Sequence, residues 1–196
     1  MDSGKNMHNA FRVVLDTFES VDKLIKFCST NEIKKKYHLP LLRFLRYSSD
    51  VDYEGWVYWS FIVLFQRLND GSINENNWID APVYAMEINL DPDTCEKPEP
   101  ELIITKFEFN NIKEWSSGFT PHFNLFYNPI HENGAFETTE HEGYDEVLPR
   151  KGQEQNISNQ FKTLKRVVRK KHNLVDITNE NAYDKIFGTI EELSKR

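Results

Sequence analysis

Glycine is scarce in this 196-residue sequence, with eight residues, and two familiar glycine-rich patterns, G-x-x-x-x-G-K-[ST] and G-x-G-x-x-G, do not occur. Those patterns place backbone N–H groups around the phosphates of a nucleotide. Their absence argues against an ATPase or a dinucleotide-dependent enzyme of the usual kind. The G-x-S-x-G turn that carries the nucleophile of many hydrolases is also missing. We therefore expect no cofactor and lean towards a non-enzymatic protein.

Cysteine and long apolar runs are equally sparse. The two cysteines, Cys28 and Cys95, form no C-x-x-C pair, so we expect two free thiols. Met1–Met7 is short and polar and lacks the apolar core of a secretory signal. The longest apolar run is shorter than the roughly 20 residues that cross a bilayer. These absences favour a cytoplasmic protein that does not enter a membrane.

The most apolar and aromatic stretch present is Trp56–Leu68, with the sequence W-V-Y-W-S-F-I-V-L-F-Q-R-L. Valine, isoleucine and aromatic residues favour a pleated strand, so we predict a long β-strand here. Its near-continuous apolar run predicts a strand covered on both faces and therefore central in its sheet.

Three further strands are expected after this one. Val83–Leu90 alternates so that Glu87 and Asn89 would face solvent. Leu102–Phe109 and Phe119–Tyr127 are the others. Because no helical stretch separates these strands, they predict an antiparallel sheet of about four strands.

Helices are expected at both ends of the chain. Asn9 can cap a helix that ends near Cys28, with an apolar stripe of Phe11, Val14, Leu15, Phe18, Val21, Ile25 and Cys28. A competing interpretation makes Phe11–Leu15 a strand and starts the helix at Ser20. A short helix is expected at Leu41–Tyr47, after Pro40.

Two more helices are expected at the C-terminal end. Apolar residues at helical spacing predict the first, with the stripe Ile157, Phe161, Leu164 and Val168. The second would begin near Thr178 and bury Ala182, Tyr183, Ile186, Phe187, Ile190 and Leu193. The sequence thus predicts an α+β fold, in which helices from the N- and C-terminal segments pack against a mostly antiparallel sheet.

Charge is distributed unevenly along what we expect to be a single domain, residues 1–196. The net charge of −7 divides into +4 for residues 1–46, −16 for residues 47–149 and +5 for residues 150–196. Such segments either pair within the molecule or offer surfaces of opposite sign to partners. Within the acidic segment, Asn128–Lys151 is polar and rich in turn residues, so we expect a mobile acidic loop.

The strongest candidate for a binding surface is the basic part of the first C-terminal helix. Six Lys and Arg residues in ten positions could follow a phosphate backbone or meet an acidic protein. They could equally pair with the acidic middle of this chain. The residues are Lys162, Lys165, Arg166, Arg169, Lys170 and Lys171.

Two weaker candidates would make the protein a metal-dependent enzyme. Asp91, Glu101 and Lys106 are the residue types that a magnesium-dependent nuclease needs, but no Glu-x-Lys lies on the second of their two strands. In the acidic loop, zinc or manganese could be held by His131, Glu137 and His141, with Glu140 and Glu142 beside them, although no H-E-x-x-H spacing occurs. More often such residues belong to a hydrated surface.

From these observations we predict a non-enzymatic interaction protein that binds a protein partner, such as an adaptor, an accessory subunit or an immunity-type inhibitor. The aromatic sheet could supply Tyr and Trp anchors for that partner. A nucleic-acid-associated protein that uses the basic helix is the first alternative. A metal-dependent nuclease or hydrolase is the second.

Overall fold

The computed structural model describes residues 3–41, 45–46, 58–91, 99–110, 112, 134–153, 155, 157 and 164–196. The expected strand at Phe119–Tyr127 and the thiol of Cys95 lie outside these residues. The chain divides into two compact units, Met1–Lys36 and Tyr37–Arg196, and each is described by itself below.

The first unit consists of the long helix α1 (Ser3–Cys28) and the single turn α2 (Asn31–Lys34). Three ion pairs between residues four apart lie along the polar side of α1: Arg12–Asp16, Glu19–Lys23 and Asp22–Lys26. Such pairs each stabilise a helix by a few tenths of a kcal/mol, roughly. One continuous helix is therefore confirmed, although it begins six residues before Asn9. The competing strand at Phe11–Leu15 is wrong.

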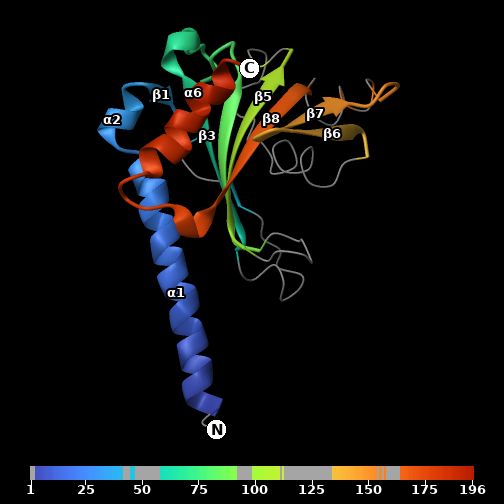
Figure 1. Cartoon of the computed structure of the whole chain (residues 1–196). Helices are drawn as coiled ribbons and strands as arrows, with labels where there is room; N and C mark the ends of the chain where they lie inside the picture. The colour runs from blue at the N-terminus through green and yellow to red at the C-terminus, as the bar shows by residue number, and fades with distance from the viewer. Residues whose placement is uncertain are drawn as a thin grey trace. The chain divides into compact units, whose positions relative to one another are not determined.

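The second unit is built on an antiparallel sheet (Figure 1). In the described part of the chain the strands follow the order β1-β3-β4-β5-β8-β7-β6, and β2 also pairs with β3. Their bounds are β1 Tyr37–His38, β2 Leu45–Arg46, β3 Ser60–Arg67, β4 Val83–Asn89, β5 Glu101–Phe109, β6 Phe136–His141, β7 Tyr144–Pro149 and β8 Leu164–Asn173. The antiparallel α+β fold is confirmed, with more strands than the four expected.

The strand predicted within Trp56–Leu68 is β3, and its side chains are buried from Ser60 to Gln66. Burial on both faces is confirmed, but β3 lies near one end of the strand order, and β5 lies at its middle. Burial on both faces also extends to β4, where Glu87 and Asn89 are each 2% exposed. The prediction that these two side chains face solvent is therefore wrong.

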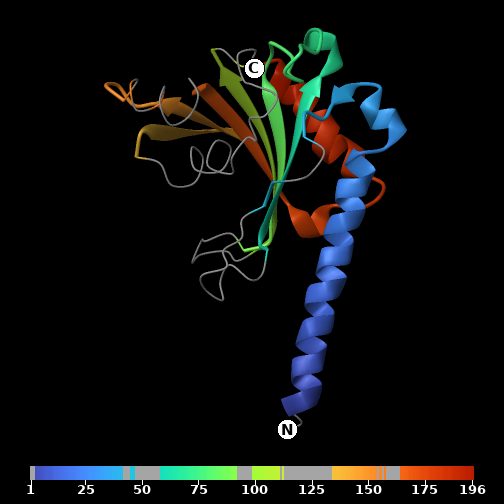
Figure 2. The same ribbon diagram turned by 180° about the vertical axis from the view of Figure 1, so that it is seen from behind.

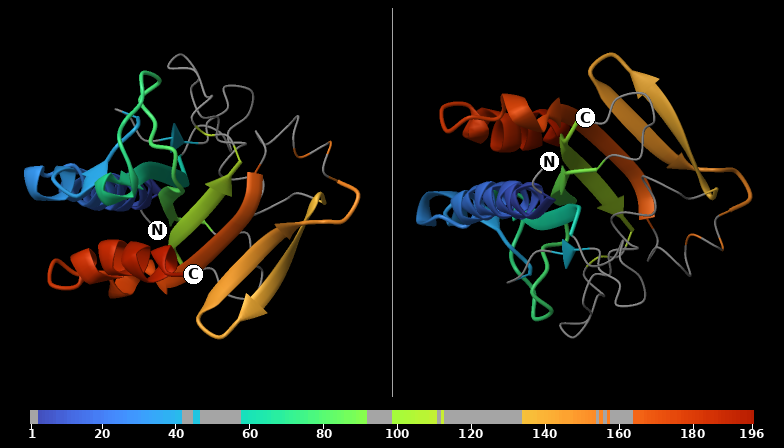
Figure 3. Two further views of the ribbon diagram at one scale, coloured as in Figure 1. Left: turned by 90° about the horizontal axis from the view of Figure 1, so that it is seen from above. Right: turned by 90° about the horizontal axis from the view of Figure 1, so that it is seen from below.

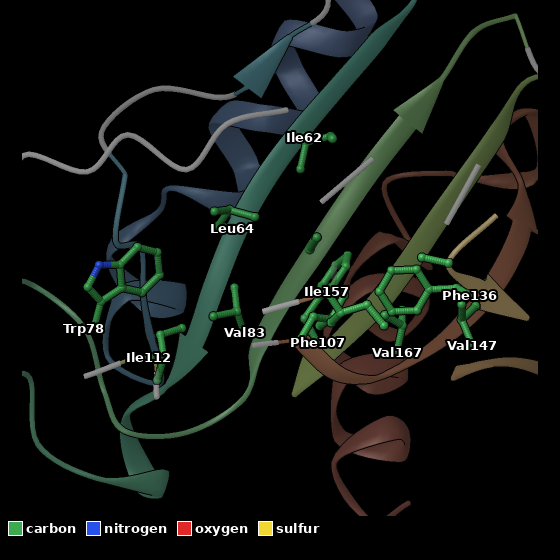
Figure 4. Close-up of a cluster of buried hydrophobic side chains, with 13 residues drawn as sticks. Ile62, Leu64, Trp78, Val83, Phe107, Ile112, Phe136, Val147, Ile157 and Val167 are labelled. Atoms are coloured by element: carbon green, nitrogen blue, oxygen red, sulfur yellow. The ribbon is translucent and has the colours of Figure 1, made fainter. Parts of the chain in front are cut away.

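One face of the sheet, here called the first face, carries the main hydrophobic cluster (Figure 4). Alternate residues of neighbouring strands supply it, because successive side chains of a strand point to opposite faces. The cluster includes Ile62, Leu64, Trp78, Val83, Ala85, Phe107, Ile112, Ala135, Phe136, Val147, Ile157, Leu164 and Val167.

The second face is covered by the C-terminal helical segment (Figures 1 and 2). This segment comprises a π-helical turn, η5 (Asp184–Gly188), followed by α6 (Thr189–Ser194). Phe187 packs against Tyr37 and Phe65, with ring centroids 4.8 and 5.5 Å apart. The predicted helix is confirmed here, and its apolar residues are buried except Tyr183, which is 39% exposed.

Two predicted helices are wrong where the structure has strands instead. Residues 164–173 form the strand β8, which pairs with β5 along nearly its whole length, so the predicted helix is wrong for these residues. Residues 155 and 157, near its predicted start, are helical, and residues 158–163 lie outside the described part. Likewise Leu45–Arg46 is the strand β2 and not part of a helix. Local apolar spacing suggested helices, whereas pairing with distant strands determined the structure.

The acidic segment also departs from expectation. Residues 136–149 form the hairpin β6–β7, which continues the sheet beyond β8 (Figure 3). Its two-residue turn is Glu142-Gly143, and Gly143 has φ +81°, a conformation that glycine adopts without strain. The prediction of a loop is wrong for these residues, while residues 128–133 lie outside the described part.

Candidate functional surfaces

The basic residues of β8 lie on both faces of the sheet, because successive side chains of a strand point to opposite faces. On the first face, Arg169 Nε lies 2.9 Å from Asp145 Oδ2 of β7, and both side chains are mostly buried. Lys171 Nζ lies 3.3 Å from Glu101 Oε2 of β5 on the same face. Each pair joins β8 to a carboxylate from the acidic middle of the sequence.

On the second face, Arg166 is the centre of a larger network. Its Nε lies 2.6 Å from Glu146 Oε1, and its Nη1 lies 3.6 Å from Glu108 Oε1. Lys106 Nζ, nearly buried, lies 2.7 Å from the same Glu108 oxygen. The Arg166–Glu146 and Lys106–Glu108 contacts are at the distance of charge-assisted hydrogen bonds, whereas Arg166 and Glu108 form a longer ion pair.

The remaining members of the basic set differ among themselves. Lys170 Nζ lies 2.7 Å from Glu192 Oε2 of α6, and this ammonium group holds the pKa of the Glu192 carboxyl below its ordinary value. Lys165 is exposed. Lys162 lies outside the described residues. Four of the six basic residues therefore have acidic partners within the chain.

The three nuclease candidates do not form one site. Glu101 lies on the first face of β5 beside Lys171, whereas Lys106 lies on the second face beside Glu108. Asp91 is exposed just after β4, and its backbone N–H donates to Asn89 Oδ1 at 3.2 Å. These three side chains therefore do not converge, as the metal site of a nuclease would require.

The metal candidates are also dispersed. His131 lies outside the described residues. Glu137 and His141 are at opposite ends of the exposed strand β6, and His141 instead stacks on Tyr144 at 4.6 Å and lies 3.6 Å from Glu146. Among the described residues no group of three or more His, Cys, Asp and Glu side chains could hold a metal ion.

Sequence reasoning missed a group of buried polar residues at one end of the first face. Ser60 Oγ donates to Glu87 Oε1 at 3.0 Å, and Asn89 lies directly opposite Ser60 in the neighbouring strand. Thr105 of β5 is also buried. The apolar residues of β4 lie on both of its faces, which would have suggested that Glu87 is buried. The alternation of polar and apolar residues near the end of β4 suggested instead that Glu87 faces solvent. A further buried polar residue, Gln66, lies on the same face at the opposite end of β3, and its Nε2 donates to the Ile79 carbonyl at 2.8 Å.

The most exposed apolar surface among the described residues lies on α1. Met7, Phe11 and Leu15 are 63%, 65% and 56% exposed, and Val14 of the same side is 37% exposed. Farther along the same stripe Val21 and Cys28 are buried, and burial raises the pKa of the Cys28 thiol to about 12. We call Met7, Phe11, Val14 and Leu15 the exposed stripe of α1. The sequence predicted Phe11, Val14 and Leu15 as part of the apolar stripe of a helix capped by Asn9, so their exposure is unexpected. Met7 lies before that predicted helix.

None of the described helices is long and apolar enough to cross a membrane. Comparison of the chain with protein-family models, with curated proteins and with solved structures finds no match.

Proposed function

We propose that this protein is a non-enzymatic interaction protein that binds a protein partner through helix α1. The observation that carries the proposal is the exposed stripe of α1. Large apolar side chains gathered on one side of a helix are characteristic of surfaces that bind another helix. We further propose that the partner presents an uncharged apolar helix face, and that the protein acts in the cytoplasm.

The charges of the sheet support this choice over the nucleic-acid alternative. Affinity for a phosphate backbone comes from Lys and Arg that are available to replace counterions. Arg166, Arg169 and Lys171 already have carboxylate partners from the acidic segment, residues 47–149, and Lys170 is paired with Glu192 of α6. Of the described basic set this leaves Lys165 as the exposed candidate, so we expect weak, salt-sensitive binding at most.

The enzymatic alternative receives less support. Glu101 and Lys106, which a metal-dependent nuclease would need in one place, lie on opposite faces of β5. No specific observation among the described residues favours a hydrolase.

A pair of substitutions on α1 tests the proposal. Phe11→Glu places a charge in the exposed stripe, whereas Val13→Glu places the same charge at an equally exposed position of another side, since Phe11 is 65% and Val13 66% exposed. Both changes suit an exposed helix position. Tagged wild type and variants would be recovered from the native host, and each co-purified protein would be retested with purified components. We expect direct binding to be lost with Phe11→Glu and kept with Val13→Glu. Equal binding by both variants would contradict the proposal.

A further inference from the structure

Most apolar residues of α1 follow a regular spacing. Seven of them are separated alternately by four and three residues: Met7, Phe11, Val14, Phe18, Val21, Ile25 and Cys28. Val13, Leu15, Leu24 and Phe27 lie outside this spacing. This is the seven-residue repeat by which two helices pack side by side, with side chains of one inserted between those of the other. Val21 and Cys28, in the second half of this repeat, are buried within the chain, whereas Met7, Phe11 and Val14 in its first half are exposed. Besides α1, the first unit holds only the four-residue α2, so no second long helix of that unit covers this first half.

Resting on the proposed function, we infer that the partner of the exposed stripe is a second copy of the same chain, and that the two α1 helices pair antiparallel. The repeat has two kinds of apolar position: one is followed by the next apolar residue after four residues, the other after three. In an antiparallel pair, a position of the first kind faces a position of the second kind. Aligned about the point between Arg12 and Val13, Phe11 faces Val14 of the second copy in each of the two central layers. Both central layers then combine an aromatic ring with an aliphatic side chain. A parallel pair would instead stack Phe on Phe and Val on Val in successive layers, which fills space less evenly.

The charges of α1 fit a homotypic pair as well. The residues that flank the seven-residue repeat between Met7 and Phe18 are His8, Ala10, Leu15 and Thr17, and none of them is Lys, Arg, Asp or Glu. Charges beside a helix seam normally select one partner over another and repel wrong ones. Here the neighbouring charges Arg12 and Asp16 pair with each other on the polar side, at 3.4 Å. Two copies can therefore meet without opposing like charges.

The test is the mass of the full-length protein in solution, measured by sedimentation equilibrium over a wide concentration range. Wild type should be a dimer that dissociates on dilution. Phe11→Glu should weaken dimerisation at least about tenfold, because two copies of the carboxylate enter the apolar layers. Val13→Glu, which carries the same charge on another side, should dimerise like wild type. Circular dichroism and melting temperature would verify that both variants fold.

Each other outcome overturns the inference in a recognisable way. A wild-type monomer at all concentrations refutes self-association, yet leaves the proposed function intact if Phe11→Glu still abolishes direct binding of a different protein. A wild-type monomer whose melting temperature falls only with Phe11→Glu would mean that the stripe packs within its own chain. A dimer that both variants retain, or both lose, would place the interface elsewhere than on this stripe.

Discussion

Individual charged residues of β8 show how distant partners change the meaning of a local pattern. In the sequence, Arg166 and Arg169 belong to a run of positive charge that suggests binding of phosphates. In the folded chain, Arg166 meets Glu146 at 2.6 Å and Arg169 meets Asp145 at 2.9 Å. The acidic and basic segments of the sequence therefore compensate each other inside the sheet, which was one of the two interpretations that the charge distribution left open.

Cys28 provides a prediction at the same scale. Its side chain is fully buried, and burial raises the thiol pKa to about 12, so the reactive thiolate is rare at neutral pH. In a Cys95→Ser background we expect Cys28 to react with a thiol reagent such as DTNB only after unfolding in guanidinium chloride. Rapid stoichiometric labelling of the native protein would contradict the assignment.

Among the elements, β3 provides the clearest test of the core. Ile62 is 1% exposed and lies in the main hydrophobic cluster. Ile62→Asp would bury a carboxylate without a partner, and we expect it to cost about 4 kcal/mol or more of unfolding free energy, so that the chain does not fold. Ile73→Asp is the matched control, because Ile73 is 46% exposed. A folded Ile62→Asp variant with an unchanged melting temperature would show that β3 is not a core strand.

The attachment of α6 to β8 should depend on pH. His172 Nε2 of β8 lies 2.9 Å from Thr189 Oγ1 of α6, and burial together with Lys185 and Lys170 lowers the His172 pKa, against a smaller opposing effect of Glu192. The unfolded chain then takes up the proton more readily than the folded chain, so stability falls as pH drops from about 6.5, the ordinary histidine value, towards the folded pKa.

Unfolding by urea at pH values from about 7 to about 5 would measure this dependence. His172→Asn should flatten the decline, whereas His8→Asn, at an exposed position of α1, controls for removal of a histidine elsewhere. An identical slope in wild type and His172→Asn would contradict the assigned role. The pKa of the Glu192 carboxyl is lowered, so the contribution of this group to stability is lost only at lower pH, below about 4.5.

These elements also show how much of the fold could be predicted. Helix α1 and strand β3 were found from their own sequence, because the period of an apolar stripe and the length of an apolar run are local properties. Strand β8 was misassigned because Leu164 and Val168 also fit helical spacing, and only pairing with β5, which lies about 60 residues earlier, favours the extended form. Hairpin β6–β7 was missed because β6 is exposed beyond Phe136, so it lacks an apolar alternation.

The candidate surface was predictable to a similar degree. The stripe of α1 could be read from the sequence, since its spacing is regular. Its exposure at Met7, Phe11, Val14 and Leu15 could not be read, because exposure depends on what the rest of the chain covers. The burial of Glu87 could not be predicted either, because it results from the packing of other residues against both faces of β4.

At the scale of the whole molecule, the central claim is that α1 joins two copies of the chain in an antiparallel pair. The most direct test is disulfide trapping between copies in a background without Cys28 and Cys95. Two single-cysteine proteins, Phe11→Cys and Val14→Cys, would be purified, oxidised separately and oxidised as a mixture. We predict that the mixture forms a cross-linked dimer between the two variants, because position 11 of one copy faces position 14 of the other. Efficient cross-linking of a Met7→Cys variant with itself would indicate a parallel pair, because the two copies of position 7 lie roughly 16 Å apart along the axis of the antiparallel pair. Absence of any cross-link between positions 11 and 14 would indicate that the helices do not meet; either result would contradict the claim.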